Sequence, residues 1–149
     1  MLNIHQLKAT NFLCYSNLAI TMSRDTVTQL VGVNGSGKSS IPTALEEAFY
    51  SKNSKGLKKE ELVKWGNKGY ELEVLFTFNS APYHLKVKRA STLRVTLSTR
   101  GEDISGHTAT QTYKILHGII GLDFTTFTKL VYQSLNSSLE FLTATDTNR

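Results

Sequence analysis

The chain has 149 residues, 40% hydrophobic and 19% charged, with a formal net charge of +5; this composition indicates one folded domain and excludes a disordered chain. Its apolar runs are only a few residues long, which excludes a membrane-spanning helix, and its first residues do not read as a secretory leader. The single cysteine, Cys14, excludes a disulfide framework and a cysteine-based zinc site within the chain, so a cytoplasmic location is expected.

The N-terminal third combines strand and helix patterns. Alternating apolar residues predict strands over 2–10 and 18–22, and a third strand over 26–31 leads into a glycine-rich loop. From Lys38 to about Tyr50, apolar residues recur at spacings of three and four, which predicts a helix. Pro42 is tolerated near the start of this helix because the first amides of a helix have no intrahelical partner.

The middle of the chain is a lysine-rich connector followed by strands. The connector covers residues 51–69 and contains a short helical candidate over 58–65. Apolar residues then alternate with polar ones, which predicts an antiparallel β-meander within residues 70–99. Its expected strands are 70–78, 83–89 and 93–97.

Basic residues gather on the meander and the connector. Pairing the last two strands antiparallel places Leu85 and Val95 on one face and the intervening basic residues on the other. Clustered basic charge indicates nucleic-acid binding, although a solvated lysine-rich face is an equally simple interpretation. The candidate DNA-binding residues are Lys52, Lys55, Lys58, Lys59, Lys86, Lys88 and Arg94.

A small helical lobe is expected within residues 106–133. Its first helix contains apolar residues at helical spacing and ends near Gly121, and its second covers 124–131 with Asp123 as the N-cap. A capping box then predicts a further helix that starts at about residue 138 and has barely begun at residue 149.

The glycine-rich loop is the most specific motif in the chain. Residues 32–39 read Gly-Val-Asn-Gly-Ser-Gly-Lys-Ser, the pattern of a phosphate-binding P-loop. Glycines let successive amides point at one anion, Lys38 brings a full charge to the β- and γ-phosphates, and the Ser39 hydroxyl can bind Mg²⁺. We therefore expect a bound nucleoside triphosphate, ATP, with Mg²⁺. The expected nucleotide-binding residues are Gly32, Asn34, Gly35, Ser36, Gly37, Lys38, Ser39 and Ser40.

A P-loop alone does not select a reaction. A GTPase would carry an Asn-Lys-x-Asp motif, which this sequence lacks, and a small kinase would follow its first helix with substrate-binding helices and a lid instead of a meander. An ABC transporter-type ATPase subunit and a non-catalytic nucleotide- or DNA-binding module remain open alternatives.

The ordered series of motifs resembles the N-terminal ATPase segment of SbcC-type DNA repair ATPases, relatives of the SMC proteins, and particularly the large subunits of bacteriophage recombination endonucleases. The resemblance covers nearly the whole chain. It rests on Asn11-Phe12 after the first strand, the loop 34–40, the segment 58–66, the passage from the meander into 127–133, the segment 139–142 and the final Asn148-Arg149.

The resemblance implies an α/β fold, an ABC-type, SMC-like P-loop half-head with an antiparallel β-meander and a helical lobe that leads to a Q-loop. The last helix, about 138–149, would then begin a coiled coil. Gln133 would contact the Mg²⁺ and the attacking water, so that Lys38 and Gln133 are the expected catalytic residues and Ser39 and Gln133 the expected metal ligands. Asn34 would lie beside the γ-phosphate.

Two residues depart from the family pattern. Leu13 stands where many members have an arginine that can touch the nucleotide, and Pro42 replaces a more usual helix former. Both departures put the strength of nucleotide binding in question.

The resemblance also implies partners. The Walker B strand and the signature loop of the family belong to a C-terminal half that is not in this sequence, so the chain is expected to bind ATP but not to hydrolyse it alone. Complete heads would form a homodimer around sandwiched ATP and act with an SbcD-type nuclease subunit on double-stranded DNA during double-strand-break end processing. The setting would be the cytoplasm of a bacterial or phage-infected cell, with no membrane partner.

Overall fold

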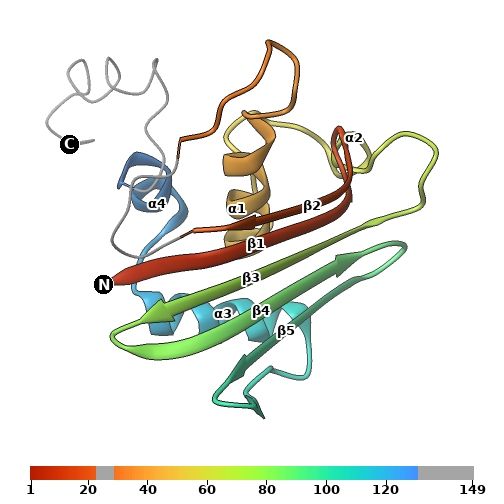
Figure 1. The fold of residues 1–149 in the computed structure, drawn as a ribbon. Helices are drawn as coiled ribbons and strands as arrows, with labels where there is room; N and C mark the ends of the chain where they lie inside the picture. Colours follow the sequence, from red (N-terminus) through yellow and green to blue (C-terminus); the bar gives the residue numbers. More distant parts are fainter. Residues whose placement is uncertain (23–28, 131–149) are drawn as a thin grey trace, which may run out of the picture.

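The computed structural model describes residues 1–22 and 29–130 (Figure 1). Gln133, the end of the second predicted helix and the expected start of a coiled coil at about 138–149 lie outside the described residues. In chain order the elements are β1 (Leu2–Phe12), β2 (Tyr15–Thr21), α1 (Ser40–Tyr50), α2 (Lys59–Leu62), β3 (Tyr70–Phe78), β4 (Ala81–Arg89), β5 (Leu93–Thr99), β6 (Glu102–Asp103), α3 (Ala109–Ile120) and α4 (Phe124–Leu130).

All strands of the described residues belong to one six-stranded antiparallel sheet of order β2-β1-β3-β4-β5-β6. The N-terminal hairpin and the meander, which the sequence predicts as separate units, are joined because β1 pairs with β3. Leu7 lies opposite Val74 and Ala9 opposite Leu72, and all of these side chains are buried. The alternation of each strand predicts its buried face, but the partner of β1 depends on packing.

Two hairpin turns use backbone angles that most residues avoid. Asn79 and Ser80 have φ values of 48° and 67°, and Arg100 and Gly101 have 50° and 86°. Positive φ at both central residues matches the twist of the flanking strands in short hairpins. As a result β4 begins at Ala81, two residues earlier than predicted, and Pro82 lies within it rather than in the turn.

Helices α1 and α3 pack against the sheet, and α4 packs against α1 (Figure 1). The inward faces of β4 and β5 are as predicted, with Leu85 and Val95 buried. Phe49 of α1 links the layers, because its ring centroid lies 5.2 Å from that of Phe76 in β3 and 5.4 Å from that of Phe127 in α4. None of the helices in the described ranges has the length and hydropathy needed to cross a membrane.

The helix boundaries follow local chemistry. Pro42 is the third residue of α1, where its missing amide leaves no hydrogen bond broken. Gly121 ends α3 with a φ of 63°, and the Asp123 carboxylate accepts a 2.6 Å hydrogen bond from the Thr126 amide, which confirms it as the N-cap of α4.

Apart from shifted strand ends, such as β2 at Tyr15–Thr21 against the predicted 18–22, two predicted elements differ from the structure. Of the predicted strand over 26–31, the structure describes residues 29–31, and these are not in a strand. They pair with no strand of the described ranges, and Val31 is 83% exposed. The predicted helix over 58–65 is a single turn, α2, because the chain from residue 62 onward pairs with the end of β1 and the turn after it instead. There the Leu13 amide donates to the Leu62 carbonyl and the Lys64 amide to the Asn11 carbonyl, each at 2.8 Å.

Candidate functional site

The glycine-rich loop runs directly into α1 and has a backbone that requires glycine. Gly35 and Gly37 have φ values of 84° and 91°, in the left-handed region that other residues avoid. A Cβ on Gly37 would also overlap the sulfur of Cys14 and the hydroxyl of Tyr15. The loop therefore rests on the turn between β1 and β2, a contact that no local sequence signal indicates.

Lys38 lies in the curve of this loop. Its Nζ donates to the carbonyl oxygens of Gly32 at 2.5 Å and Val33 at 2.8 Å, and it lies 3.4 Å from the hydroxyl of Ser36. The loop thereby holds a full positive charge beside its own amides. An anionic ligand at the loop would find both amide donors and an ammonium group.

The N-terminus of α1 adds to this positive potential. Ser39 is the N-cap residue, and its side chain makes no capping hydrogen bond, so its hydroxyl is not used in closing the helix. A second ammonium group lies here, because Lys55 Nζ donates to the Ser39 carbonyl at 2.8 Å. The segment that carries Lys55 is held by buried Glu46, whose carboxylate accepts 2.8 Å hydrogen bonds from the amide and hydroxyl of Ser54. Sequence reasoning assigned Lys55 to DNA, whereas the structure places it against the loop.

A cavity of about 840 Å³ opens beside the loop. Most of the predicted nucleotide-binding residues line it: Asn34, Gly35, Gly37, Lys38, Ser39 and Ser40. Gly32 and Ser36 do not. The remaining lining residues come from the turn after β1 and from the segment after α1. Leu13 stands at a position that the family resemblance links to the nucleotide, and the others were not assigned to a site from the sequence. These remaining residues are Leu13, Cys14, Glu60, Glu61, Val63, Lys64, Trp65, Gly66 and Asn67.

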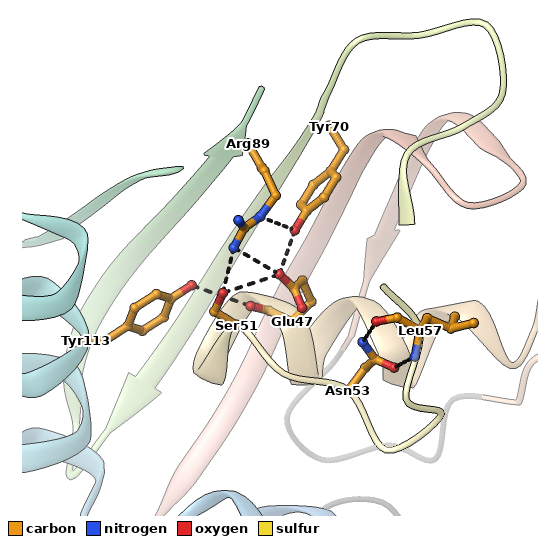
Figure 2. A network of polar contacts seen from close by, with 7 residues as sticks. All are labelled: Glu47, Ser51, Asn53, Leu57, Tyr70, Arg89 and Tyr113. Atoms are coloured by element: carbon orange, nitrogen blue, oxygen red, sulfur yellow. Dashed lines mark hydrogen bonds and ion pairs between the residues drawn. The ribbon is translucent and has the colours of Figure 1, made fainter. Parts of the chain in front are cut away.

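The other end of α1 is fixed to the sheet by a buried polar network (Figure 2). The Glu47 carboxylate accepts a 2.6 Å hydrogen bond from the Tyr70 hydroxyl and lies 3.6 Å from Arg89 Nη2. Arg89 also donates to the Tyr70 oxygen at 3.0 Å and to the Ser51 hydroxyl at 2.7 Å. Burial raises the pKa of Glu47, and the Tyr70 hydrogen bond and the Arg89 charge oppose that rise. The helix that begins at the glycine-rich loop is thus anchored to β3 and β4.

A protein-family model described as an AAA domain (AAA_23) matches residues 6–149. The chain belongs to this AAA domain family. The matched region contains the glycine-rich loop and every residue that lines the cavity beside it.

The curated relatives of this AAA domain are much longer proteins. The chain is 49% identical over 151 residues to the Probable exonuclease subunit 2 of Escherichia phage T5, a match that covers 99% of the chain and 25% of that protein. It is 26% identical over 129 residues to the DNA double-strand break repair Rad50 ATPase of Methanococcus maripaludis, covering 87% of the chain and 13% of that protein. These relatives confirm the resemblance to SbcC-type repair ATPases, and the chain spans a quarter or less of their length.

The fold of the AAA domain also matches solved structures. The recombination mediator protein RecF with ATP superposes with a TM-score of 0.61 at 16% sequence identity, over 75% of this chain and 30% of RecF. At this identity the likeness concerns the fold alone, and it confirms the predicted α/β fold class.

The outer face of the meander differs from the basic surface that the sequence suggests. Lys86 and Lys88 point to this face as predicted, but Glu71 and Glu73 of β3 share it. Glu71 forms an ion pair with Lys88, and Glu73 lies 3.7 Å from Lys86 and 2.5 Å from His84. The face is of mixed charge because the β3–β4 register sets each acid directly opposite a lysine.

The remaining DNA-contact candidates lie at other places of the AAA domain. Arg94 is on the outer face of β5, beside Lys88 in the register. Lys52, Lys58 and Lys59 line a separate cavity of about 490 Å³ next to α2 and α4. The candidates therefore form no single patch, and their role in DNA binding stays a prediction.

Proposed function

We propose that this chain is the ATP-binding N-terminal half of the head of a DNA repair ATPase that acts with a nuclease subunit. The observation that carries the proposal is the glycine-rich loop at the N-terminus of α1, with Lys38 and Ser39 on the wall of a cavity of about 840 Å³. The names of the relatives, an exonuclease subunit and Rad50 repair ATPases, support the same assignment.

The residues of the loop have distinct roles in this proposal. The amides around Gly35 and Gly37 and the N-terminus of α1 bind the phosphates, and Lys38 neutralises charge on the β- and γ-phosphates. Asn34 lies beside the γ-phosphate, and Gly32, Ser36 and Ser40 complete the loop.

Mg²⁺ suits the hydroxyl of Ser39, which lines the cavity and is not used as a helix cap. The ion would supply further charge neutralisation on the phosphates. Gln133, the second proposed ligand and catalytic residue, stays a prediction outside the described residues.

In this proposal, hydrolysis requires parts of the head beyond the glycine-rich loop. We propose that a C-terminal half supplies them, and that complete heads dimerise around ATP and regulate an SbcD-type nuclease subunit on double-stranded DNA. The setting is the cytoplasm of a bacterial or phage-infected cell. Because phosphoryl transfer depends on positioning and charge, a half-site binds ATP with little turnover.

Two measurements test the proposal. In calorimetric titrations with Mg²⁺, ATP binds the chain, and Lys38→Ala weakens binding by at least about tenfold through loss of a charge-assisted contact. Lys114→Ala, on the exposed side of α3, is the matched control and leaves binding unchanged. Turnover appears only when the C-terminal half of the phage T5 relative is added. Failure of the wild-type chain to bind ATP, or turnover by the chain alone that Lys38→Ala abolishes, contradicts the proposal.

A further inference from the structure

Trp65 has an exposure that is unusual for its residue type. It is the single tryptophan of the chain, it is 96% exposed, and it lines the cavity beside the glycine-rich loop. Tryptophan is ordinarily among the more buried residues, because exposing its large apolar surface to water is unfavourable. A bare indole on the wall of a cavity therefore indicates a ligand with an apolar or aromatic face.

The backbone around Trp65 holds it in this position. Residue Val63 forms a β-bridge with Phe12, and the Lys64 amide donates to the Asn11 carbonyl at 2.8 Å. After Trp65 the chain turns back, with a 3.1 Å hydrogen bond from the Asn67 amide to the Lys64 carbonyl. Both sides of Trp65 are thus tied by hydrogen bonds, so its exposure results from a fixed backbone.

The side chain of Lys64 strengthens this arrangement. Its Nζ donates to the Ser16 hydroxyl at 2.6 Å. The segment 62–64 is therefore attached to the β1–β2 turn on which the glycine-rich loop rests. The segment that carries Trp65 and the glycine-rich loop thus contact the same turn.

We infer that Trp65 stacks on the base of the nucleoside triphosphate whose phosphates bind the glycine-rich loop, an inference that rests on the proposed function. Trp65 is the only aromatic among the described residues that line the cavity. The segment ahead of the loop, residues 23–31, contains no aromatic residue that could take this part. The indole face presents a π-surface that a planar base covers.

The chemistry of stacking defines what Trp65 contributes. Every base has a π-face, so stacking adds affinity while tolerating different bases, and a larger purine gains more than a pyrimidine. A ligand with phosphates but no base gains nothing from Trp65. Affinity for ATP and affinity for inorganic tripolyphosphate therefore respond differently to loss of the indole.

The single tryptophan makes the test direct. Titration of the chain with ATP in Mg²⁺ changes the Trp65 fluorescence, whereas tripolyphosphate binds without that change. By calorimetry, Trp65→Ala weakens ATP binding by about fivefold to a hundredfold and leaves tripolyphosphate binding unchanged. Trp65→Phe retains most of the affinity for ATP. Ile115→Ala removes an exposed apolar side chain of α3 away from the cavity and serves as the matched control.

The possible outcomes separate the two levels of the proposal. Equal ATP affinity in Trp65→Ala and wild type, with tripolyphosphate bound by both, overturns the stacking role and leaves the proposed function intact. Equal weakening of ATP and tripolyphosphate also overturns it, because Trp65 would then act only on the loop. Binding of neither ligand by the wild-type chain overturns the proposed function and the stacking role together.

Discussion

The Glu47 carboxylate lies 3.6 Å from Arg89 Nη2, with side-chain exposures of 3% and 9% (Figure 2). The pair joins the last turns of α1 to the end of β4, and the Tyr70 hydroxyl bridges it by donating to Glu47 and accepting from Arg89. Desolvation of two charges is unfavourable, and these hydrogen bonds offset it. The pair thereby specifies how the helix that carries the glycine-rich loop sits on the sheet.

Removal of Arg89 should leave a buried carboxylate without its cation. We expect Arg89→Met to lower the free energy of unfolding by about 3–5 kcal/mol, measured by urea denaturation. Lys88→Met, which removes the neighbouring exposed cation and its ion pair with Glu71, should lower it by less than about 1 kcal/mol. The double variant Glu47→Gln/Arg89→Met should recover part of the loss. Similar losses for the two single variants would contradict the role of the buried pair.

The free energy of unfolding should depend on pH through the ionisation of Glu73 and its contacts with neighbouring basic residues. Burial alone would raise the pKa of Glu73, but the hydrogen bond with His84 and the charges of Lys86 and Lys8 outweigh it and lower the pKa below its ordinary value of 4.5. A lowered pKa in the folded state stabilises the fold above pH 4.5, and this contribution is lost as the pH falls through the folded pKa.

Glu73→Gln removes this contribution. Because Glu73 is partly exposed, we expect the wild-type advantage at neutral pH to be below about 1 kcal/mol and to vanish at an acidic pH below the folded pKa of Glu73. Urea denaturation at both pH values checks this, and Glu102→Gln on the exposed strand β6 is the control. An advantage that persists unchanged at the lower pH would show that the ionised carboxylate is not its source.

The two left-handed glycines of the loop should respond differently to alanine. Gly35→Ala introduces backbone strain alone, because a Cβ there meets open space, and should lower the free energy of unfolding by about 1–2 kcal/mol. Gly37→Ala adds an overlap with Cys14 and Tyr15 and should lower it by more. It should also weaken ATP binding by more than about tenfold, as measured by calorimetry. Equal effects of the two substitutions would mean that the loop does not depend on the β1–β2 turn.

Five of the seven DNA-contact candidates should divide into two groups. In residues 1–22 and 29–130, Lys86 and Lys88 form ion pairs with acids, whereas Lys52, Lys58 and Lys59 form none. Cations without an ion pair among these residues are more available to DNA phosphates, so reversing the charge of the second group should weaken DNA binding more and reduce its salt dependence more. Fluorescence anisotropy with a duplex at several salt concentrations measures both quantities. A larger loss of DNA affinity in Lys86→Glu/Lys88→Glu would indicate that the DNA interface lies on the meander.

Much of this AAA domain follows from local patterns in the sequence. The glycine-rich loop, the start of α1 around Pro42, the inward faces of β4 and β5, and the helix ends at Gly121 and Asp123 are all predictable. Each depends on the conformation of a few neighbouring residues, through backbone periodicity, caps and positive φ. Local physics is sufficient for features of this kind.

Only the tertiary structure decided which distant residues meet. The pairing of β1 with β3, the acids opposite Lys86 and Lys88, and the Glu47–Arg89 pair depend on strand register and helix packing. The position of Trp65 beside the loop likewise arises because residues 62–64 pair with the end of β1 rather than continue α2. Such contacts join segments far apart in the chain, and no spacing in the sequence encodes them. The sequence alone determined that a phosphate-binding loop exists, and the fold decided what surrounds it.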